Sequence, residues 1–171
     1  MALFDRQGYD ATTVAQIAEA AGLTKRTFFR YFSDKREVLF NGSRELQDCW
    51  VGGINAAPPD AGPMTAVCAG LDRVAELFAD RHSFARTRAR VVADNPELQE
   101  RELIKLRSLA DAVRAALVDR GVAENTAVLA SEAGVTVFHV AFARWVQQDD
   151  PAVFRQLMDE SLDELRSAVA R

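Results

Sequence analysis

The side chains with the clearest chemistry lie in one short stretch, residues 23–35, which reads LTKRTFFRYFSDK. Its four cations are Lys25, Arg26, Arg30 and Lys35. On a helix, successive side chains turn by about 100°, so Phe28 and Phe32 point to one side while the two arginines point to the other. A helix with one apolar and one cationic face can pack on a protein with the first and bind a polyanion with the second.

The residues before this stretch predict another short helix that packs against it. Thr13 and Gln16 form a capping-box pattern at its start. Its small apolar residues at helical spacing are Val14, Ile17, Ala18 and Ala21. A tight turn, AAGLT, separates the two helices, with Gly22 ending the first and Thr24 capping the second. This arrangement is typical of a helix-turn-helix, whose second helix enters the major groove of DNA.

We expect the first turn of that second helix to reach base edges, because the N-terminal residues of a recognition helix lie deepest in the groove. Lys25, Arg26 and Thr27 occupy this turn, directly after Thr24, and Arg26 can bond guanine with two N–H groups. The residues further along, where phosphate oxygens are the nearer partners, are Arg30, Tyr31 and Lys35.

Phe29 lies between the two faces of the helix, where it either packs beside the DNA backbone or closes the small domain. The alternative for the whole stretch is a solvated cationic face without a partner. We favour DNA, because the cations coincide with the exposed face and with a capped, glycine-containing turn.

Charge and composition restrict the classes of protein. The net charge is −4, but residues 1–44 carry seven cations and five carboxylates, against fourteen and twenty in the remainder, so the N-terminal part is the candidate for a polyanionic partner. Two cysteines, Cys49 and Cys68, without CxxC spacing or a histidine cluster, indicate neither a zinc site nor a disulfide framework and fit a reducing cytoplasm. We expect no metal and no cofactor. We find no strand pattern, no leader pattern and no apolar run near 18 residues, so an all-α fold outside the membrane is expected.

The segment from Leu3 to Phe40 resembles the DNA-binding segment of TetR-family transcriptional regulators. The matching residues are Phe4, Gly8, Thr13, Val14, Ile17, Ala18, Ala21, Gly22, Thr27 to Phe32, Lys35 and Leu39. By position, the resemblance implies the same base contacts and backbone contacts as above. Phe29 departs from it, because many members have Tyr there and its hydroxyl contact with phosphate would be missing. The family's first helix also usually begins further upstream and carries extra cations, so we expect either a shortened chain or a weaker grip on the backbone.

The resemblance divides the chain into a helix-turn-helix DNA-binding domain, residues 1–44, and a ligand-binding and dimerisation domain, residues 45–171. Ser33 is expected to cap a helix that bends or breaks at Asn41-Gly42, and the breaker-rich residues 52–63 are expected to be the seam between the two parts. Helices are then predicted at roughly 64–81, 83–93, 95–121, 124–148 and 151–170.

Members of the family pair their last two helices into a four-helix bundle across the dimer. The sequence favours this too, with a small-residue stripe on one helix and an apolar ridge on the next. The residues expected at the interface are Ala130, Gly134, Val137, Ala141, Phe154, Leu157, Met158, Leu162 and Leu165. The alternative is that both stripes face the core of their own domain.

A ligand pocket is expected between the central helices. Its apolar candidates are Leu77, Phe78, Phe84, Leu106, Phe138 and Phe142, and its polar candidates are Arg88, His139 and Trp50. Aromatic residues at helical spacing are more often core than pocket wall, so this set competes with ordinary packing.

These features predict a homodimeric repressor that binds a palindromic operator and is released by a small, largely apolar inducer. One alternative is an enzyme or carrier built on a helical bundle, but Glu-x-x-His pairs, phosphate-binding glycine motifs and nucleophile motifs are absent from the sequence. The other is a sequence-independent DNA binder, against which the acidic net charge argues.

Overall fold

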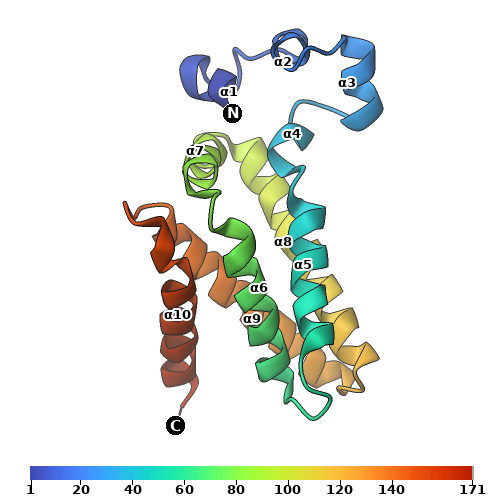
Figure 1. Ribbon diagram of the computed structural model, residues 1–171, viewed down its shortest axis with the longest axis vertical. Coiled ribbons are helices and arrows are strands. Elements are labelled where there is room, and N and C mark those ends of the chain that lie inside the picture. Colours follow the sequence, from blue (N-terminus) through green and yellow to red (C-terminus); the bar gives the residue numbers. More distant parts are fainter. Residues whose placement is uncertain (171) are drawn as a thin grey trace.

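The computed structural model describes residues 1–170 and is all-helical over that range (Figure 1). The elements are α1 (Ala2–Gln7), α2 (Val14–Ala20), α3 (Lys25–Tyr31), α4 (Glu37–Phe40), α5 (Ser43–Ala56), α6 (Pro63–Phe78), α7 (His82–Ala93), α8 (Pro96–Asp119), α9 (Glu124–Trp145), the 3-10 turn η1 (Pro151–Val153) and α10 (Phe154–Val169). The all-α prediction is confirmed. Residue 171, at the end of the second predicted domain, lies outside the described residues.

Helices α1 to α4 lie together at one end of the molecule, and we call them the head; α5 to α10 form an elongated bundle below it (Figure 1). Local signals shape the head as predicted. Thr13 and Gln16 form a complete capping box at the start of α2. Gly22, at φ 66°, ends that helix, and the Leu23 N–H returns to the Ala18 carbonyl at 2.8 Å, as in a Schellman motif.

Two local predictions about the chain beyond α3 are wrong, and one is confirmed. Ser33 caps no helix; the Asp34 carboxylate instead accepts the backbone N–H groups of Arg36 and Glu37, at 2.8 and 3.2 Å. Residues 52–63 are not a seam, because α5 continues to Ala56 and pairs closely with α6. The break at Asn41-Gly42 is confirmed, since α4 ends at Phe40 and α5 begins at Ser43.

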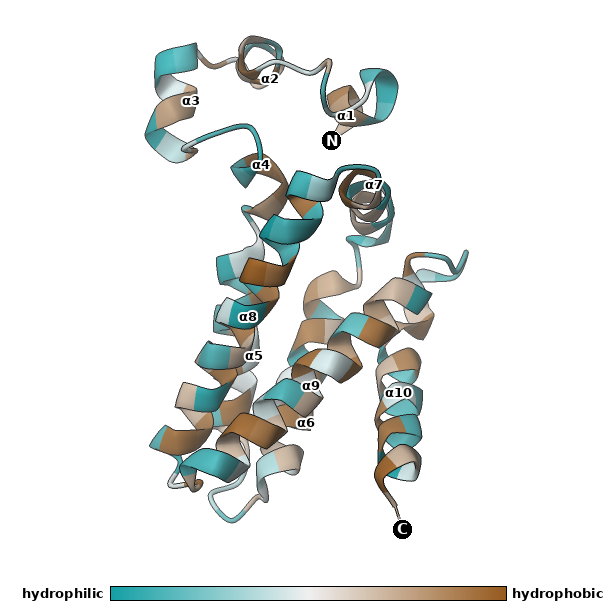
Figure 2. Cartoon of the chain, turned by 180° about the vertical axis from the view of Figure 1, so that it is seen from behind, coloured by the Kyte–Doolittle hydropathy of each residue, from teal (hydrophilic) through white to brown (hydrophobic). Residues whose placement is uncertain are grey.

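The core of the bundle is built from aromatic and aliphatic side chains of every helix from α5 to α10. Trp50 is completely buried, and its indole N–H donates to the Val67 carbonyl at 3.2 Å. The backbones of α5 and α6 approach so closely at Gly53 and Gly70 that a Cβ on either would overlap its neighbour. Figure 2 shows the resulting amphipathic helices, with hydrophobic and hydrophilic residues on different sides of α10. The bundle therefore has a dense core fixed by close helix packing.

A second, smaller core joins the head to the bundle. Its four buried head residues are Phe4, Tyr9, Leu39 and Phe40, and they pack on Val91, Val92 and Leu98 of α7 and the start of α8. The head thus rests on α7 and α8 through α1 and α4, while α2 and α3 extend away from the bundle (Figure 1).

Helix α9 is 22 residues long and apolar enough, by length and composition, to cross a membrane, contrary to the expectation that no such run exists. In the fold it packs against α6, α8 and α10 as a central core helix. Burial explains part of its apolar character, because Val135, Val137 and Phe138 lie in the core, whereas Leu129 and Val140 are exposed.

Candidate DNA-binding helix and ligand pocket

Helix α3 presents its cations to solvent and packs beside α2. Phe28 is almost fully buried, and its ring lies 5.1 Å from that of Phe32, between centroids. The Thr24 hydroxyl accepts the Thr27 N–H at 3.1 Å and lies 3.0 Å from the Thr27 hydroxyl, so the first turn is capped. This cap fixes the direction in which the first turn points, as a recognition helix requires.

Lys25 and Arg26 stand exposed on that first turn. Within residues 1–170, neither side chain has a hydrogen bond or an ion pair with another part of the chain. Their donors are therefore available to an external acceptor such as a base edge or a phosphate.

The residues predicted to contact phosphate are held differently. Arg30 lies over the ring of Tyr31 and donates to its hydroxyl at 2.9 Å, and the Tyr31 side chain is 64% exposed. Phe29 is also exposed, at 55%. Lys35 is half-buried, donates to the Tyr9 carbonyl at 2.7 Å and lies 3.9 Å from the centre of the Tyr9 ring. Lys35 thus ties the loop after α3 to the loop after α1.

A cavity of about 130 Å³ lies where α4 and α5 meet α6, α7, α8 and α9. Eight of the nine predicted pocket residues line it, namely Leu77, Phe78, Phe84, Arg88, Leu106, Phe138, His139 and Phe142. The wall also includes Leu39 and Gly42, so the cavity reaches the junction of the head with the bundle. A mostly apolar cavity with a few polar groups is the usual form of a small-molecule site.

Trp50 is the ninth predicted pocket residue, and its placement there is wrong. The side chain is fully buried between α5 and α6, where its N–H is already bonded to the Val67 carbonyl. A tryptophan with its polar atom satisfied inside the core has no donor left for a ligand.

The two stripes predicted for the dimer interface face the core of their own chain, which corrects that prediction. Eight of the nine residues are buried in the single chain, namely Ala130, Gly134, Val137, Ala141, Phe154, Leu157, Met158 and Leu162, and Leu165 packs beside them. Gly134 shows why the stripe is small, because a Cβ there would overlap the side chain of Val67. The small residues allow α9 to approach α6.

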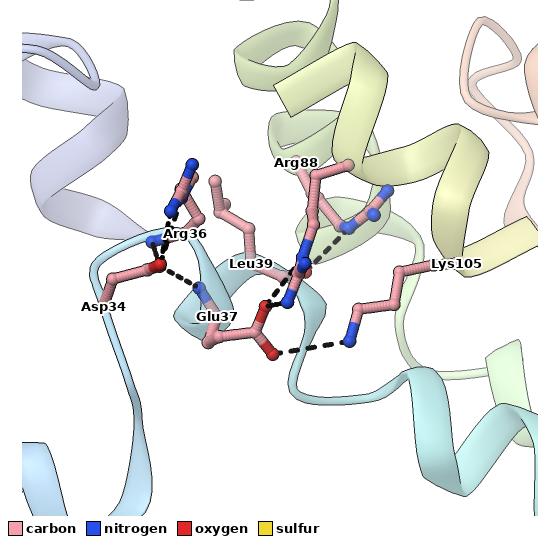
Figure 3. A network of polar contacts seen from close by, with 7 residues as sticks. Asp34, Arg36, Glu37, Leu39, Arg88 and Lys105 are labelled. Carbon is pink, nitrogen blue, oxygen red and sulfur yellow. Dashed lines mark hydrogen bonds and ion pairs between the residues drawn. The ribbon is translucent and has the colours of Figure 1, made fainter. Parts of the chain in front are cut away.

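A charged network that the sequence analysis missed connects α4 to α7 and α8 (Figure 3). Glu37 accepts bonds from Arg101 and from Lys105, and Arg88 donates to the Leu39 carbonyl. Beside it, Asp34 holds Arg36, and the guanidinium lowers the pKa of that carboxyl. Charged residues on amphipathic helices ordinarily indicate a solvated face, so no local signal reveals these partners.

A capped α3 with free cations, joined through α4 to a bundle that encloses a small apolar cavity, defines a helix-turn-helix transcriptional regulator with a sensor domain. Residues 1–41 match the family model for bacterial regulatory proteins of the tetR family, and residues 61–170 match the MftR C-terminal domain. The chain belongs to the TetR family of transcriptional regulators.

Two curated relatives match part of this chain. The regulator TcmR from Streptomyces glaucescens is 38% identical over 65 residues, which are 38% of this chain and 29% of TcmR. The regulator RutR from Escherichia coli is 31% identical over 64 residues, which are 37% of this chain and 30% of RutR. The matches therefore span less than a third of the length of these relatives.

Two solved structures share the whole fold. PfmR, a TetR-family regulator from Thermus thermophilus, is 25% identical with a TM-score of 0.52, over 95% of this chain and 93% of that one. A TetR-family regulator from Mesorhizobium loti is 20% identical with a TM-score of 0.60, over 98% of this chain and 91% of that one, and this likeness concerns the fold alone.

Proposed function

We propose that this chain is a cytoplasmic, homodimeric repressor, not an enzyme, that binds a palindromic operator and is released by a small, largely apolar inducer. The observation that carries the proposal is the pair of free cations, Lys25 and Arg26, on a capped recognition helix at one end of a chain whose sensor cavity reaches α4. Base edges are read by Lys25, Arg26 and Thr27, and phosphates by Arg30 and Tyr31.

Two recognition helices of a dimer would enter successive major grooves about 34 Å apart. An inducer can release them only if it binds better to a conformer with different head spacing. The cavity suits this role because its wall includes Leu39, the residue before Phe40 at the end of α4, together with helices of the bundle.

For the dimer, we propose the outward side of α9 in place of the buried stripes. Leu129 is 72% exposed and Val140 40%, and Leu103 of the adjacent α8 is 65% exposed. Exposed apolar side chains gathered on neighbouring helices are typical of a protein–protein contact. Leu129→Glu is expected to convert a dimer to a monomer in sedimentation equilibrium.

The experiment that tests the regulator measures binding of the purified protein to DNA flanking its own gene and to random DNA of equal length, at near-physiological salt. A specific regulator prefers its site by about 10³-fold or more. Equal affinity for both DNAs, in a preparation freed of bound small molecules by refolding, would instead indicate a sequence-independent binder.

A further inference from the structure

Two of the three cations in the wall of the cavity, Arg88 and Lys105, also hold α4 in place, while the third, Arg81, bonds Glu45 of α5. The Arg88 Nε donates to the Leu39 carbonyl at 2.8 Å, and the Lys105 Nζ lies 3.4 Å from the Glu37 carboxylate. Arg101 donates to the same carboxylate at 2.9 Å through its Nε. Figure 3 shows Glu37 and Leu39 of α4 facing Lys105 and Arg88. Helix α4 is therefore fastened to α7 and α8 by side chains of the bundle.

Two of these cations, Arg88 and Lys105, line the cavity together with Glu102. The Arg88 side chain is only 15% exposed and Lys105 is 29% exposed, so both charges sit largely out of water. The rest of the wall is mainly aromatic and aliphatic, including Phe78, Phe138 and Leu106. A ligand in this cavity meets an apolar surface with a cationic end.

The charged network around α4 contains one more cation than carboxylates. Its three cations, Arg88, Arg101 and Lys105, face two carboxylates, Glu37 and Glu102, which leaves one positive charge in excess. Several N–H groups of Arg88 and Lys105 also have no acceptor among the described residues. Arg88 makes two of its possible bonds, to Leu39 and Glu102, and within residues 1–170 Lys105 makes one long bond, to Glu37. Partly buried cations with spare donors favour an added anion.

We infer that the cavity binds a small monocarboxylic acid with an aromatic or branched apolar body, and that its carboxylate takes Arg88 and Lys105 from their partners on α4. One excess charge calls for a monoanion. The volume of about 130 Å³ suits a body of about one ring, since a cavity near 150 Å³ accommodates benzene. The inference rests on the proposed function, and it adds both the class of inducer and the contact through which it acts.

The consequence for α4 follows from its length. It has only four residues, and at its start the Asp34 carboxylate accepts the N–H groups of Arg36 and Glu37. In the bound conformer that we infer, Lys105 and Arg88 turn toward the ligand carboxylate, so that Glu37 keeps only Arg101 and the Leu39 carbonyl loses its donor. The ligand binds best where these bonds are broken, so it shifts the population toward a loosened α4 and a displaced head.

The first test uses sodium benzoate and its neutral isostere benzamide, titrated into DNA-free protein by calorimetry. Benzoate is expected to bind at least about tenfold more tightly, because a charged hydrogen-bond pair in a partly buried site contributes that much or more. Lys105→Met should lower the affinity for benzoate about tenfold and leave that for benzamide unchanged. Arg107→Met, two residues along α8 and exposed, is the matched control and should change neither. Equal affinities for the two compounds, or no saturable benzoate binding, overturns the inference.

The second test follows hydrogen exchange of the backbone amides of residues 37–40, again without DNA. Saturating benzoate should speed exchange there several-fold in the native protein, and Glu37→Gln should show fast exchange before any benzoate is added. Unchanged exchange in the presence of bound benzoate overturns the release of α4. Neither test involves DNA, so failure to find a selective operator would refute the proposed function while leaving these results to decide the ligand and the α4 contact.

Discussion

The head and the bundle of this chain are stabilised in different ways. The bundle buries two tryptophans completely, Trp50 and Trp145, and its helices touch at glycine positions. In the α2–α3 part of the head, the fully buried side chains are Ala18 and Phe28, and caps and turns fix the rest. Local bonds give geometry but little stability, because each nets about 1 kcal/mol or less. This difference in packing indicates a rigid bundle that carries a head able to move or unfold on its own.

The largest effect is expected from the bundle core. Trp50→Ala should lower the free energy of unfolding by about 3–5 kcal/mol, because it leaves a cavity at the closest contact of α5 and α6. Denaturant unfolding at equilibrium measures this. Trp50→Phe keeps most of the volume and loses the bond to the Val67 carbonyl, so it should cost about 1 kcal/mol. A loss below about 1 kcal/mol for the alanine variant would show that the bundle core tolerates the cavity.

In the head, Phe28→Ala should abolish specific DNA binding while the thermal transition of the bundle persists. Phe28 is buried in the head, beside Phe29 and Phe32, and α3 contacts α2, so its loss is expected to loosen α3 from α2. Amide exchange of residues 14–31 should rise toward unprotected rates, while that of α9 changes little. Phe29→Ala, at an exposed position on the same helix, is the control for packing and should leave the amide exchange of residues 14–31 unchanged. If bundle and head melt together in the Phe28 variant, the two parts are one cooperative unit.

The sequence predicts the head well because its determinants are neighbours along the chain. The capping box at Thr13, the Thr24 cap, the stop at Gly22 and the break at Asn41-Gly42 each depend on a few consecutive residues. The prediction of a cap at Ser33 is wrong because Asp34, one residue later, competes for the same N–H groups with a stronger acceptor.

In the bundle, periodicity reveals an apolar face but not the partner that covers it. The small residues around Gly134 predict a contact with a second chain, whereas they admit Val67 of the same chain. The bonds of Glu37 to Arg101 and Lys105 join residues 64 and 68 positions apart, a distance that no sequence pattern encodes. Eight pocket residues were nevertheless identified, because aromatic residues crowd the inner faces of α6 and α9.

Substitution of a free cation on α3 tests how the head recognises bases, without disturbing the fold. Arg26→Ala should cost about 1–3 kcal/mol of discrimination at one base position, because we propose that Arg26 reads a base edge with two N–H groups. Competition binding with single-base operator variants locates the position. Arg166→Ala, an exposed cation at the far end of α10, is the control for loss of charge. Equal weakening on specific and random DNA would assign Arg26 to a phosphate instead.

Lys35→Ala separates two roles of one side chain. If Lys35 also contacts phosphate, the variant should bind all sequences more weakly, by about 1 kcal/mol, and the salt dependence of log K should become shallower by about one unit. If Lys35 only holds the Tyr9 carbonyl, the affinity falls but the salt slope is unchanged. Titrations at several salt concentrations, on operator and on random DNA, distinguish the two outcomes.

The smallest effect is expected at the exposed pair between Glu45 of α5 and Arg81 before α7, where both oxygens of Glu45 are bonded, at 2.6 and 2.7 Å. Arg81 lowers the pKa of Glu45, so the pair stabilises the fold above the ordinary pKa of a glutamate, and this stability is lost as the pH falls through the lowered pKa. Because both side chains are more than one third exposed, Glu45→Gln should cost no more than about 1 kcal/mol at pH 7 and nothing in strong acid. Asp48→Asn, on the same helix and exposed, is the matched control. A larger loss of stability at pH 7 for the Glu45 variant would mean that this pair fastens the start of α5 to α7. The boundary between the head and the bundle would then extend beyond α4.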